Sequence, residues 1–347
     1  MLLVDGTFAK RGYGGIAQDN RAIVSEFSKM NFVKILHDKG EPAGRSNHIH
    51  LNHKLSTLNK RALISGKTIP DIFWDGNFFQ THLTGLASPA FSDKTYLRIH
   101  DLFPISNPEW YTIPGKRLFS IAFKSIKPNT IFVCNSQSTR KQLEKYPNFS
   151  QHESLVLGCR VMADFQTSHP CENCSVCKGQ FTSKTFLLAV GTIEPRKNYE
   201  RLLDAWEQVG GKSIFDCLII VGKEGWKQRT FIKNLSSRKN FEWHTPCNFS
   251  LRLLFKLASG FISASLDEGF DMPSVEARSF GVESALSDIA VHRELCPGAK
   301  IFFNPYHGID IQRAILSFSG ARQTILKKAI DELWYAQFNN LVNHILN

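Results

Sequence analysis

The chain has 347 residues, of which 42% are hydrophobic and 21% charged. Such a composition is that of an ordinary globular protein, and the length favours two domains over a single hydrophobic core. No stretch approaches the roughly 18 apolar residues of a membrane span, and MLLVDGTF at the start lacks the basic and apolar regions of a secretory signal. We therefore expect a cytoplasmic protein.

The net charge of +11 is concentrated in the first half of the chain. Residues 1–150 hold 20 Lys or Arg against 11 Asp or Glu, whereas residues 151–347 hold 22 against 20. A basic half indicates an anionic partner, either a phosphorylated acceptor or the inner face of an anionic membrane, and a merely basic surface is the alternative. We expect no nucleic-acid partner, because the sequence has neither an RNA-binding aromatic motif nor a basic groove-reading helix.

The first half alternates strands with helices. LLVDGT at 2–7 predicts a buried strand, RGYGG at 11–15 a turn, and the apolar spacing from Ile16 to Met30 a helix. This order is typical of the start of a nucleotide-binding unit, although the G-x-G-x-x-G spacing is absent. Asn135 to Ser138 predict the cap of a helix that continues to about Lys145. Further strands are predicted at 32–36, 71–74, 95–99 and 131–134.

Two groups of polar residues in this half are candidates for function. His100 and Asp101 directly follow the strand at 95–99, and open α/β sheets place their sites at such strand ends. Four other histidines lie in or beside a polar segment over 38–70, without carboxylates or thiols at ligand spacing, so we interpret that segment as a surface or acceptor loop rather than a metal site. These are His37, His48, His50 and His53.

A break rich in glycine, proline, serine and threonine predicts the domain boundary, with a linker over 161–183. Within it, Cys171, Cys174 and Cys177 have C-x2-C-x2-C spacing, with His169 nearby. That set is compatible with structural zinc, but the usual second C-x2-C pair is missing, so reduced surface thiols are the simpler interpretation. The other cysteines are scattered and do not form a disulfide framework.

The second half again alternates strands and helices, which predicts a second parallel sheet. Strands are predicted at 186–190, 217–221, 241–244, 260–263, 282–286 and 301–303. Helices are predicted at 199–209, at about 227–239, and at 251–258, 273–280 and 325–346, and residues 309–318 complete the domain.

The stretch DEGFDMPSVEARSFGV at 267–282 organises the candidate site. Pro273 suits the first turn of a helix, Gly281 suits its end, and the helix N-terminus suits a phosphate. Glu268 lies before this terminus and Glu276 one turn inside the helix. Two more strand-end loops, GTIEPRKN at 191–198 and VGKEG at 221–225, add cations and glycines. Together these groups suit a sugar attached to a diphosphate.

On these motifs the chain resembles the retaining glycosyltransferases of family 4 over nearly its whole length. Glu268 and Glu276 form the E-x7-E motif, and GTIEPRKN with LRIHDLFPISNPEW at 97–110 resembles the bacterial mannosyltransferase branch. VDGT and GGI near the start, VCNSQST at 133–139 and the Trp-containing C-terminal segment also fit. The resemblance implies the α/β fold called GT-B: two Rossmann-like, doubly wound parallel-sheet domains facing a central cleft.

The resemblance also implies roles for the domains. Residues 1–160 would form the N-terminal acceptor-binding domain and residues 184–328 the nucleotide-sugar-binding domain, while a helix over 329–347 would return to the first domain. The donor would be a nucleotide-diphospho sugar, with GDP-mannose favoured and a UDP-sugar as the alternative, and neither a cofactor nor a metal would be required. The acceptor would be a saccharide or lipid-linked saccharide in cell-surface polysaccharide synthesis.

Among individual residues, the resemblance assigns the donor sugar to Glu268, the ribose to Glu276 and the diphosphate to Lys197 with Arg196. His100 would lie beside the sugar and be oriented by Asp101. Asp271 departs from the glycine that many members carry at its position. The remaining substrate contacts would come from Gly14, Gly15, Thr192, Gly222, Lys223, His244, Gly269, Phe270, Asp271, Met272, Pro273 and Ser274.

The implied chemistry is substitution at the anomeric carbon with retained configuration, in which the leaving diphosphate takes the acceptor's proton. Two alternatives remain. A nucleotide-sugar epimerase of the same architecture would convert the donor in an assay without acceptor. A non-catalytic binding protein, or a scaffold stabilised by zinc at Cys171 to Cys177, would be revealed by donor-binding calorimetry and metal analysis.

Overall fold

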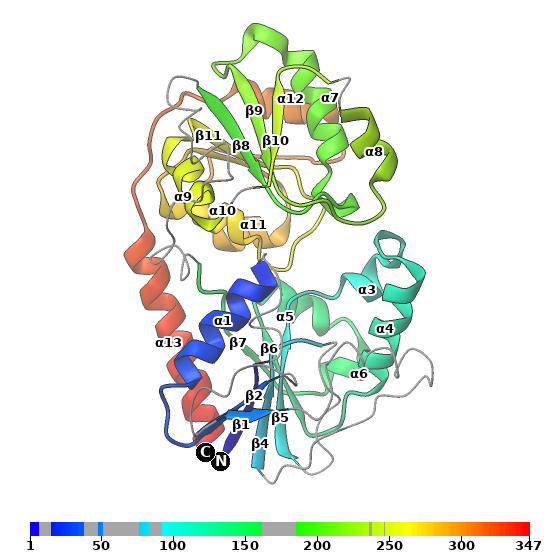
Figure 1. The fold of residues 1–347 in the computed structure, drawn as a ribbon, viewed down its shortest axis with the longest axis vertical. Helices are drawn as coiled ribbons and strands as arrows, with labels where there is room; N and C mark the ends of the chain where they lie inside the picture. The colour runs from blue at the N-terminus through cyan, green and yellow to red at the C-terminus, as the bar shows by residue number, and fades with distance from the viewer. Residues whose placement is uncertain are drawn as a thin grey trace. The chain divides into compact units, whose positions relative to one another are not determined.

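The computed structural model describes residues 1–6, 15–37, 48–50, 76–83, 92–161, 185–235, 238–245 and 247–347. The chain divides into two compact units (Figure 1). The first comprises Met1–Arg160 together with Leu333–Asn347, and the second comprises Val161–Glu332. Almost all of the predicted linker, including Cys171, Cys174 and Cys177, lies outside the described residues. The hypothesis of a zinc site concerns these three cysteines and stays a prediction.

The first unit is built on a seven-stranded parallel sheet in the order β3-β2-β1-β4-β5-β6-β7. All residues of β1 and β6 are buried, as expected for parallel strands covered on both faces. The strands are β1 Leu2–Asp5, β2 Val33–His37, β3 His48–His50, β4 Gly76–Gln80, β5 Ser92–Ile99, β6 Thr130–Cys134 and β7 Ser154–Val156.

Three of these strands, β3, β4 and β7, were not predicted from the sequence. β3 lies within the segment interpreted as a surface loop, so that interpretation is wrong for His48–His50. The polar residues of β3 gave no strand signal, because β3 pairs at the edge of the sheet with β2 only. The strand expected at 71–74 lies outside the described residues, whereas β4 begins at Gly76.

The helices of the first unit are α1 Gly15–Phe27, α3 Phe103–Ser106, α4 Ile113–Lys124, α5 Gln137–Leu143 and α6 Pro147–Ser150, with a 3-10 turn at Pro108–Trp110. The predicted cap of α5 is confirmed, because the Ser136 hydroxyl accepts a hydrogen bond from the Thr139 N–H at 3.0 Å.

The C-terminal helix α13, Lys327–Leu346, packs on the core of the first unit. The Phe338 ring lies 4.9 Å from the ring of Phe27, centroid to centroid, and stacks on Trp334 at 5.1 Å. The Trp334 indole N–H donates to the Gly158 carbonyl at 3.0 Å. The predicted return of the C-terminal helix to the first domain is therefore confirmed.

The second unit contains a six-stranded parallel sheet in the order β10-β9-β8-β11-β12-β13. The order reverses between β8 and β11, which is the switch point where open α/β sheets bind ligands. The strands are β8 Phe186–Val190, β9 Cys217–Val221, β10 Phe241–His244, β11 Gly260–Ser263, β12 Ser284–Ser287 and β13 Ile301–Phe303. The helices are α7 Tyr199–Val209, α8 Arg229–Asn234, α9 Asn248–Leu257, α10 Met272–Ser279, α11 Ala290–Leu295 and α12 Gly308–Leu316.

Helix α10 has the predicted start and end. Pro273 lies in its first turn, and Gly281 has a φ of 66°, the left-handed conformation that favours glycine after a helix. The strand expected from Val282 instead begins at Ser284, and α8 is shorter than the predicted 227–239 helix. Within the described ranges, no helix is long and apolar enough to cross a membrane.

Candidate functional site

The site in the second unit lies at the carboxyl ends of β8 and β11, the two strands on either side of the switch point. After β8, the chain forms a 3-10 turn at Pro195–Lys197 and then passes through Asn198 with a φ of 57°. After β11, it forms the loop that leads into α10. The Leu266 N–H donates to the Arg196 carbonyl at 2.8 Å, and this backbone bond joins the two loops.

Lys197 is the buried cation of the site. Its Nζ lies 2.6 Å from Oε1 of Glu268 and 3.0 Å from Oδ1 of Asp271, with 7% of the side chain exposed. Burial by itself would lower the pKa of Lys197, but the charges of Asp271 and Glu268 outweigh burial and raise it. Lys197 is therefore a fixed positive charge held between two carboxylates.

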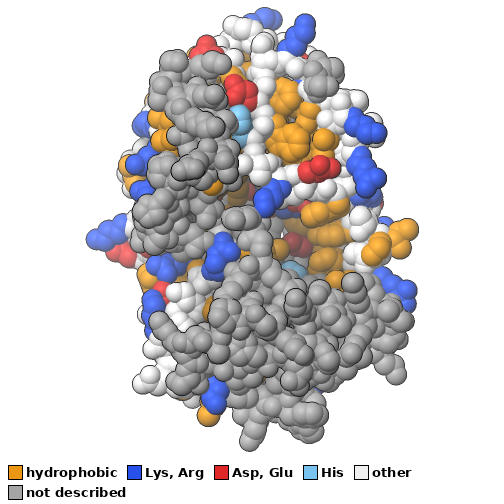
Figure 2. Space-filling view, viewed as in Figure 1, with side chains coloured by type: hydrophobic (Ala, Val, Ile, Leu, Met, Phe, Trp, Pro, Cys, Tyr) orange, Lys and Arg blue, Asp and Glu red, His pale blue; other side chains and the backbone are white. Residues whose placement is uncertain are grey.

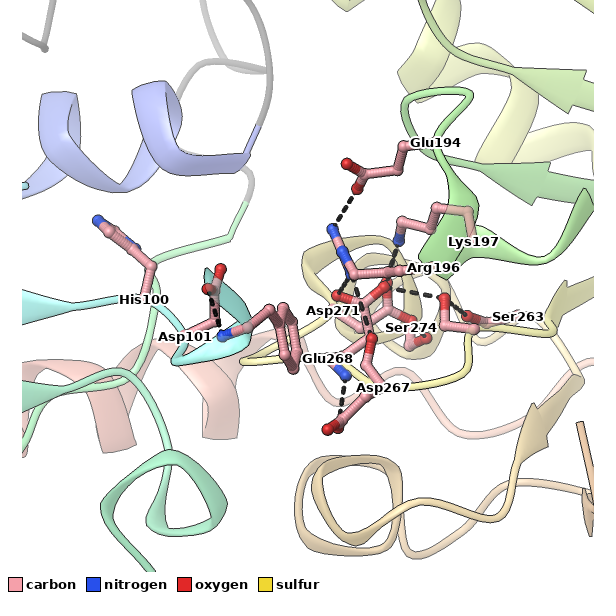
Figure 3. Close-up of polar contacts among 12 residues, drawn as sticks. His100, Asp101, Glu194, Arg196, Lys197, Ser263, Asp267, Glu268, Asp271 and Ser274 are labelled. Carbon is pink, nitrogen blue, oxygen red and sulfur yellow. Dashed lines mark hydrogen bonds and ion pairs between the residues drawn. The ribbon is translucent and has the colours of Figure 1, made fainter. Parts of the chain in front are cut away.

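Arg196 is the second cation and is more accessible than Lys197. One terminal nitrogen pairs with Oε2 of Glu268, and the other lies 2.6 Å from Oε1 of Glu194 (Figure 3). Burial opposes ionisation of Glu268, yet Arg196 and Lys197 lower its pKa, so this carboxylate is charged. The Ser265 hydroxyl also donates to Glu268 at 2.8 Å. Both oxygens of Glu268 are thus bound to protein groups.

Asp271 lies at the N-terminus of α10 with a φ of 55°. Glycine adopts this left-handed conformation readily, whereas it costs free energy for a residue with a side chain. Here the carboxylate accepts hydrogen bonds from Lys197, from the Ser274 hydroxyl and from Nε2 of His292. Burial would raise the pKa of Asp271, but Lys197 and His292 hold it well below its usual range.

Glu276 differs sharply from Glu268. It is 2% exposed, and its Oε1 atom is buried without a hydrogen-bond partner in the described parts of the chain. Burial, with a contribution from the charge of Asp271, raises the pKa of Glu276 to about 8. An unpaired buried oxygen is costly, so this carboxyl group suits a ligand hydroxyl that would satisfy it.

Gly222, in the loop that follows β9, allows close packing of the backbone. A Cβ atom on Gly222 would lie 1.9 Å from the Gly191 carbonyl oxygen, so no other residue fits there. Thr192 is half-buried beside this contact, and Lys223 is exposed. The Gly222 N–H donates to the His244 carbonyl at 2.9 Å, and the His244 ring lies 2.9 Å from Glu242.

The remaining predicted contacts surround the start of α10. The Ser274 N–H donates to the Asp271 carbonyl at 3.1 Å, so this donor is used within the turn in the present state. Pro273 is half-buried. The buried members of this group are Gly269, Phe270, Met272 and Ser274.

In the first unit, His100 follows β5 and is largely buried. Its Nε2 atom lies 3.2 Å from the Thr81 carbonyl, and burial together with the charge of Arg98 lowers its pKa to about 3. His100 is therefore neutral at physiological pH. Asp101 accepts a hydrogen bond from the Phe103 N–H at 3.2 Å, whereas Asp19 is the carboxylate found 3.8 Å from His100.

The two N-terminal glycines are less informative. Gly15 is exposed at the start of α1, and Gly14 lies outside the described residues.

Sequence reasoning missed Glu194, Ser265 and His292 in the second unit. Of these, His292 had a usable signal, because it follows β12, the next strand beyond β11, whose carboxyl end lies at the same edge of the sheet. In the parts of the chain that the structure describes, no group of three or more His, Cys, Asp or Glu side chains could hold a metal ion.

Most of the second unit matches a known protein family. The profile of the family described as glycosyl transferases group 1 matches residues 177–320, which include the whole charged cluster of the second unit. A serotype-specific mannosyltransferase, WbdA of Escherichia coli, is 24% identical over 233 residues, or 62% of this chain. The O-antigen chain mannosyltransferase RfbU of Salmonella typhimurium is 27% identical over 65% of this chain.

The chain covers 29% of WbdA and 61% of RfbU, so it matches less than two thirds of either relative. Among solved structures, a sucrose-phosphate synthase from Thermosynechococcus elongatus superposes with a TM-score of 0.70 at 13% identity, covering 99% of this chain and 97% of that one.

The two doubly wound sheets and this superposition define a protein of the GT-B fold, as predicted. Residues 177–320 match the family of group 1 glycosyl transferases, and the chain is distantly similar to bacterial O-antigen mannosyltransferases.

Proposed function

We propose that this protein transfers a hexose from a nucleotide-diphospho sugar to a saccharide or lipid-linked saccharide, with retention of configuration. The observation that carries the proposal is the cluster of Lys197, Arg196, Glu268 and Asp271 at the switch point, beside the unpaired oxygen of Glu276. Mannose is the favoured sugar, because the relatives WbdA and RfbU are mannosyltransferases. GDP-mannose is accordingly the favoured donor and a UDP-sugar the alternative.

The ion pairs support an exchange on donor binding. A diphosphate competes with Glu268 and Asp271 for Lys197 and Arg196, since all of these partners are anionic acceptors. Once Arg196 and Lys197 bind the diphosphate instead of Glu268, this carboxylate can accept hydrogen bonds from sugar hydroxyls. Glu276 then accepts a ribose hydroxyl at its unpaired oxygen. In this account the binding groups are already assembled in the resting protein.

The chemical step follows from this arrangement. The bond between the anomeric carbon and the diphosphate oxygen breaks, and the acceptor oxygen bonds to the same face of that carbon. The acceptor's proton moves to the departing diphosphate oxygen. Lys197 and Arg196 stabilise the negative charge that develops there, and His100, as a neutral ring, would contact the sugar.

A ligand screen by thermal unfolding tests the donor assignment. A nucleotide sugar at about 100 times its dissociation constant should stabilise the folded protein by roughly 2.7 kcal/mol. We expect GDP-mannose to raise the unfolding temperature more than UDP-glucose does. The Lys328→Ala variant removes one positive charge from the exposed surface. It controls for the effect of the protein's net charge on the shift in unfolding temperature that a ligand causes. Equal shifts for all nucleotide sugars, or none, would refute the donor assignment.

The role of Glu268 needs a separate test. A Glu268→Gln variant keeps the size of the side chain but removes the charge, and we expect turnover to fall by about 100-fold. Undiminished turnover in this variant would exclude Glu268 from sugar binding.

Peripheral contact of the first unit with an anionic membrane is part of the proposal. Helix α4 exposes 82% of Ile113 and carries Lys116, Arg117 and Lys124 without an acidic residue. Such a helix suits an interface that is both apolar and anionic. On the face shown in Figure 2, the described Lys and Arg side chains are scattered rather than gathered in one patch. Sedimentation with phosphatidylglycerol vesicles, comparing Lys116→Gln/Arg117→Gln with the wild type, tests this contact.

A further inference from the structure

The charged cluster includes a buried histidine that the proposed reaction does not use. His292 lies on α11, just after β12, with 1% of its surface exposed. Its Nε2 atom is 2.9 Å from Oδ2 of Asp271, and its Nδ1 atom is 2.9 Å from the carbonyl oxygen of Ser287. Both ring nitrogens thus have partners within the second unit.

The chemistry of those partners indicates the protonation of the ring. The Ser287 carbonyl can only accept a hydrogen bond. The Ser287 hydroxyl, 3.2 Å from Nδ1, already donates to the Ser265 carbonyl at 2.6 Å, so it too accepts from the ring. Asp271 is an ionised acceptor on the other side, bound also to Lys197. Only the imidazolium form donates from both nitrogens.

With protons on both ring nitrogens, His292 would complete the charge balance of the cluster. Arg196, Lys197 and His292 supply three positive charges, which match the three carboxylates of Glu194, Glu268 and Asp271. When Lys197 turns from Asp271 to a diphosphate, Asp271 would become an unpaired buried anion unless another cation stays with it. An uncompensated buried charge is strongly unfavourable. Whether Lys197 can leave Asp271 therefore depends on His292, the partner of the other carboxylate oxygen, Oδ2.

We propose that His292 is a positioning residue, which holds Asp271 neutralised so that Lys197 can leave it for the diphosphate of the donor. The inference rests on the proposed function, because it takes Lys197 as the diphosphate ligand. It goes further by naming the group that keeps Lys197 available although the buried Asp271 lies beside it.

A double-mutant cycle measured by calorimetry with GDP, and with UDP as a second probe, tests the coupling. We expect His292→Gln to weaken GDP binding by about tenfold, because Asp271 then retains Lys197. In the Asp271→Asn background the same substitution should change the affinity by less than about twofold. Equal losses in the two backgrounds would overturn the proposal.

Nitrogen-15 NMR of the histidine rings gives a readout that a merely structural role would not move. We expect the wild-type His292 ring to carry protons on both nitrogens at pH 7.5 and to lose one in Asp271→Asn. A neutral ring in the wild type would contradict the inference. This measurement decides the question even if His292→Gln fails to fold, which thermal unfolding of each variant will show.

Failure of the proposed function is distinguishable from failure of this inference. If Lys197→Met binds GDP as tightly as the wild type, Lys197 does not bind the diphosphate and the proposed function is at fault. If Lys197→Met loses affinity while the effects of His292→Gln and Asp271→Asn are additive, only the role of His292 is refuted.

Discussion

Each unit places a buried cation against a carboxylate at the carboxyl edge of its sheet, yet the two cations are held differently. In the first unit, Arg98 and Asp19 are both fully buried, with Nε of Arg98 2.9 Å from Asp19. The two terminal nitrogens of Arg98 also donate to the carbonyls of Cys134, Leu157 and Gly158. In the second unit, the buried Nζ of Lys197 contacts two carboxylates.

We propose that this difference separates a structural cation, Arg98, from a cation that binds the donor, Lys197. Backbone carbonyls cannot leave Arg98 without unfolding the loop after β7, so a ligand cannot exchange for them. Carboxylates can be replaced by the oxygens of a phosphate, because both are anionic acceptors. Among the described residues, a buried oxygen without a partner is found in both units, on Asp19 as well as on Glu276, so such an atom does not by itself distinguish the two cations. Burial of a charge alone therefore does not indicate function, whereas exchangeable partners do.

The largest effect is expected from Arg98→Met. Removing the guanidinium leaves Asp19 as an unpaired buried charge, and breaking such a pair costs about 3–5 kcal/mol of unfolding free energy. Urea unfolding monitored by tryptophan fluorescence measures the loss. A loss below about 1 kcal/mol, or a variant that is stable but binds GDP poorly, would show that Arg98 belongs to the binding groups instead.

Lys197→Met should act chiefly on the reaction. We expect turnover of the folded variant to fall by about 100-fold or more, because the leaving diphosphate loses its buried cation. Initial rates of GDP release in the presence of acceptor measure this loss. Lys197→Arg serves as the matched control that keeps the charge, and it should recover part of the activity. Full activity of Lys197→Met would remove the distinction between the two cations.

Glu276→Gln should change how stability depends on pH. The pKa of Glu276 is raised to about 8 in the folded protein, so the group binds more protons folded than unfolded between the two pKa values. Its contribution to stability is therefore complete below the unfolded pKa and is lost as the pH rises towards 8.

Relative to Glu276→Gln, the wild type should lose on the order of 1 kcal/mol per pH unit as the pH rises through that window. Urea unfolding of both proteins at pH 5, 6, 7 and 8 measures the difference. A difference that stays constant or grows with pH would mean that Glu276 is ionised and paired.

Arg160→Met should have the smallest effect. Arg160 lies over the rings of Trp334 and Tyr335 and pairs with Glu26 at 2.8 Å, but it is partly exposed. Such contacts contribute about 1 kcal/mol or less, because solvent competes for the cation. A thermal unfolding scan suffices as the measurement. A loss as large as that of Arg98→Met would mean that α13 is anchored by charge rather than by its buried aromatic residues.

Much of the second unit could be predicted from the sequence, because its strands are short apolar runs and its helices have clear starts. The strands at 186–190, 217–221, 241–244, 260–263 and 301–303 agree residue for residue with the structure. The edge strand β3 was missed because its polar residues carry no hydrophobic pattern.

The connections within the site were harder to predict. The spacing of Glu268 and Glu276 indicates two carboxylates near one helix N-terminus, but not that one is fully paired while the other keeps an unpaired oxygen. That difference depends on Arg196 and Lys197, which come from a loop about 70 residues earlier in the chain. His292 was missed because its role depends on a contact with Asp271 across two loops.

The central claim is retaining sugar transfer at the carboxyl edge of the second unit. The most direct test is proton NMR of the product formed from an α-linked donor, GDP-mannose first, with a mannoside acceptor. We expect an α-linked product that forms with the wild type and is lost in Lys197→Met. A β-linked product, or the same α-linked product formed at an undiminished rate by Lys197→Met, would contradict the claim.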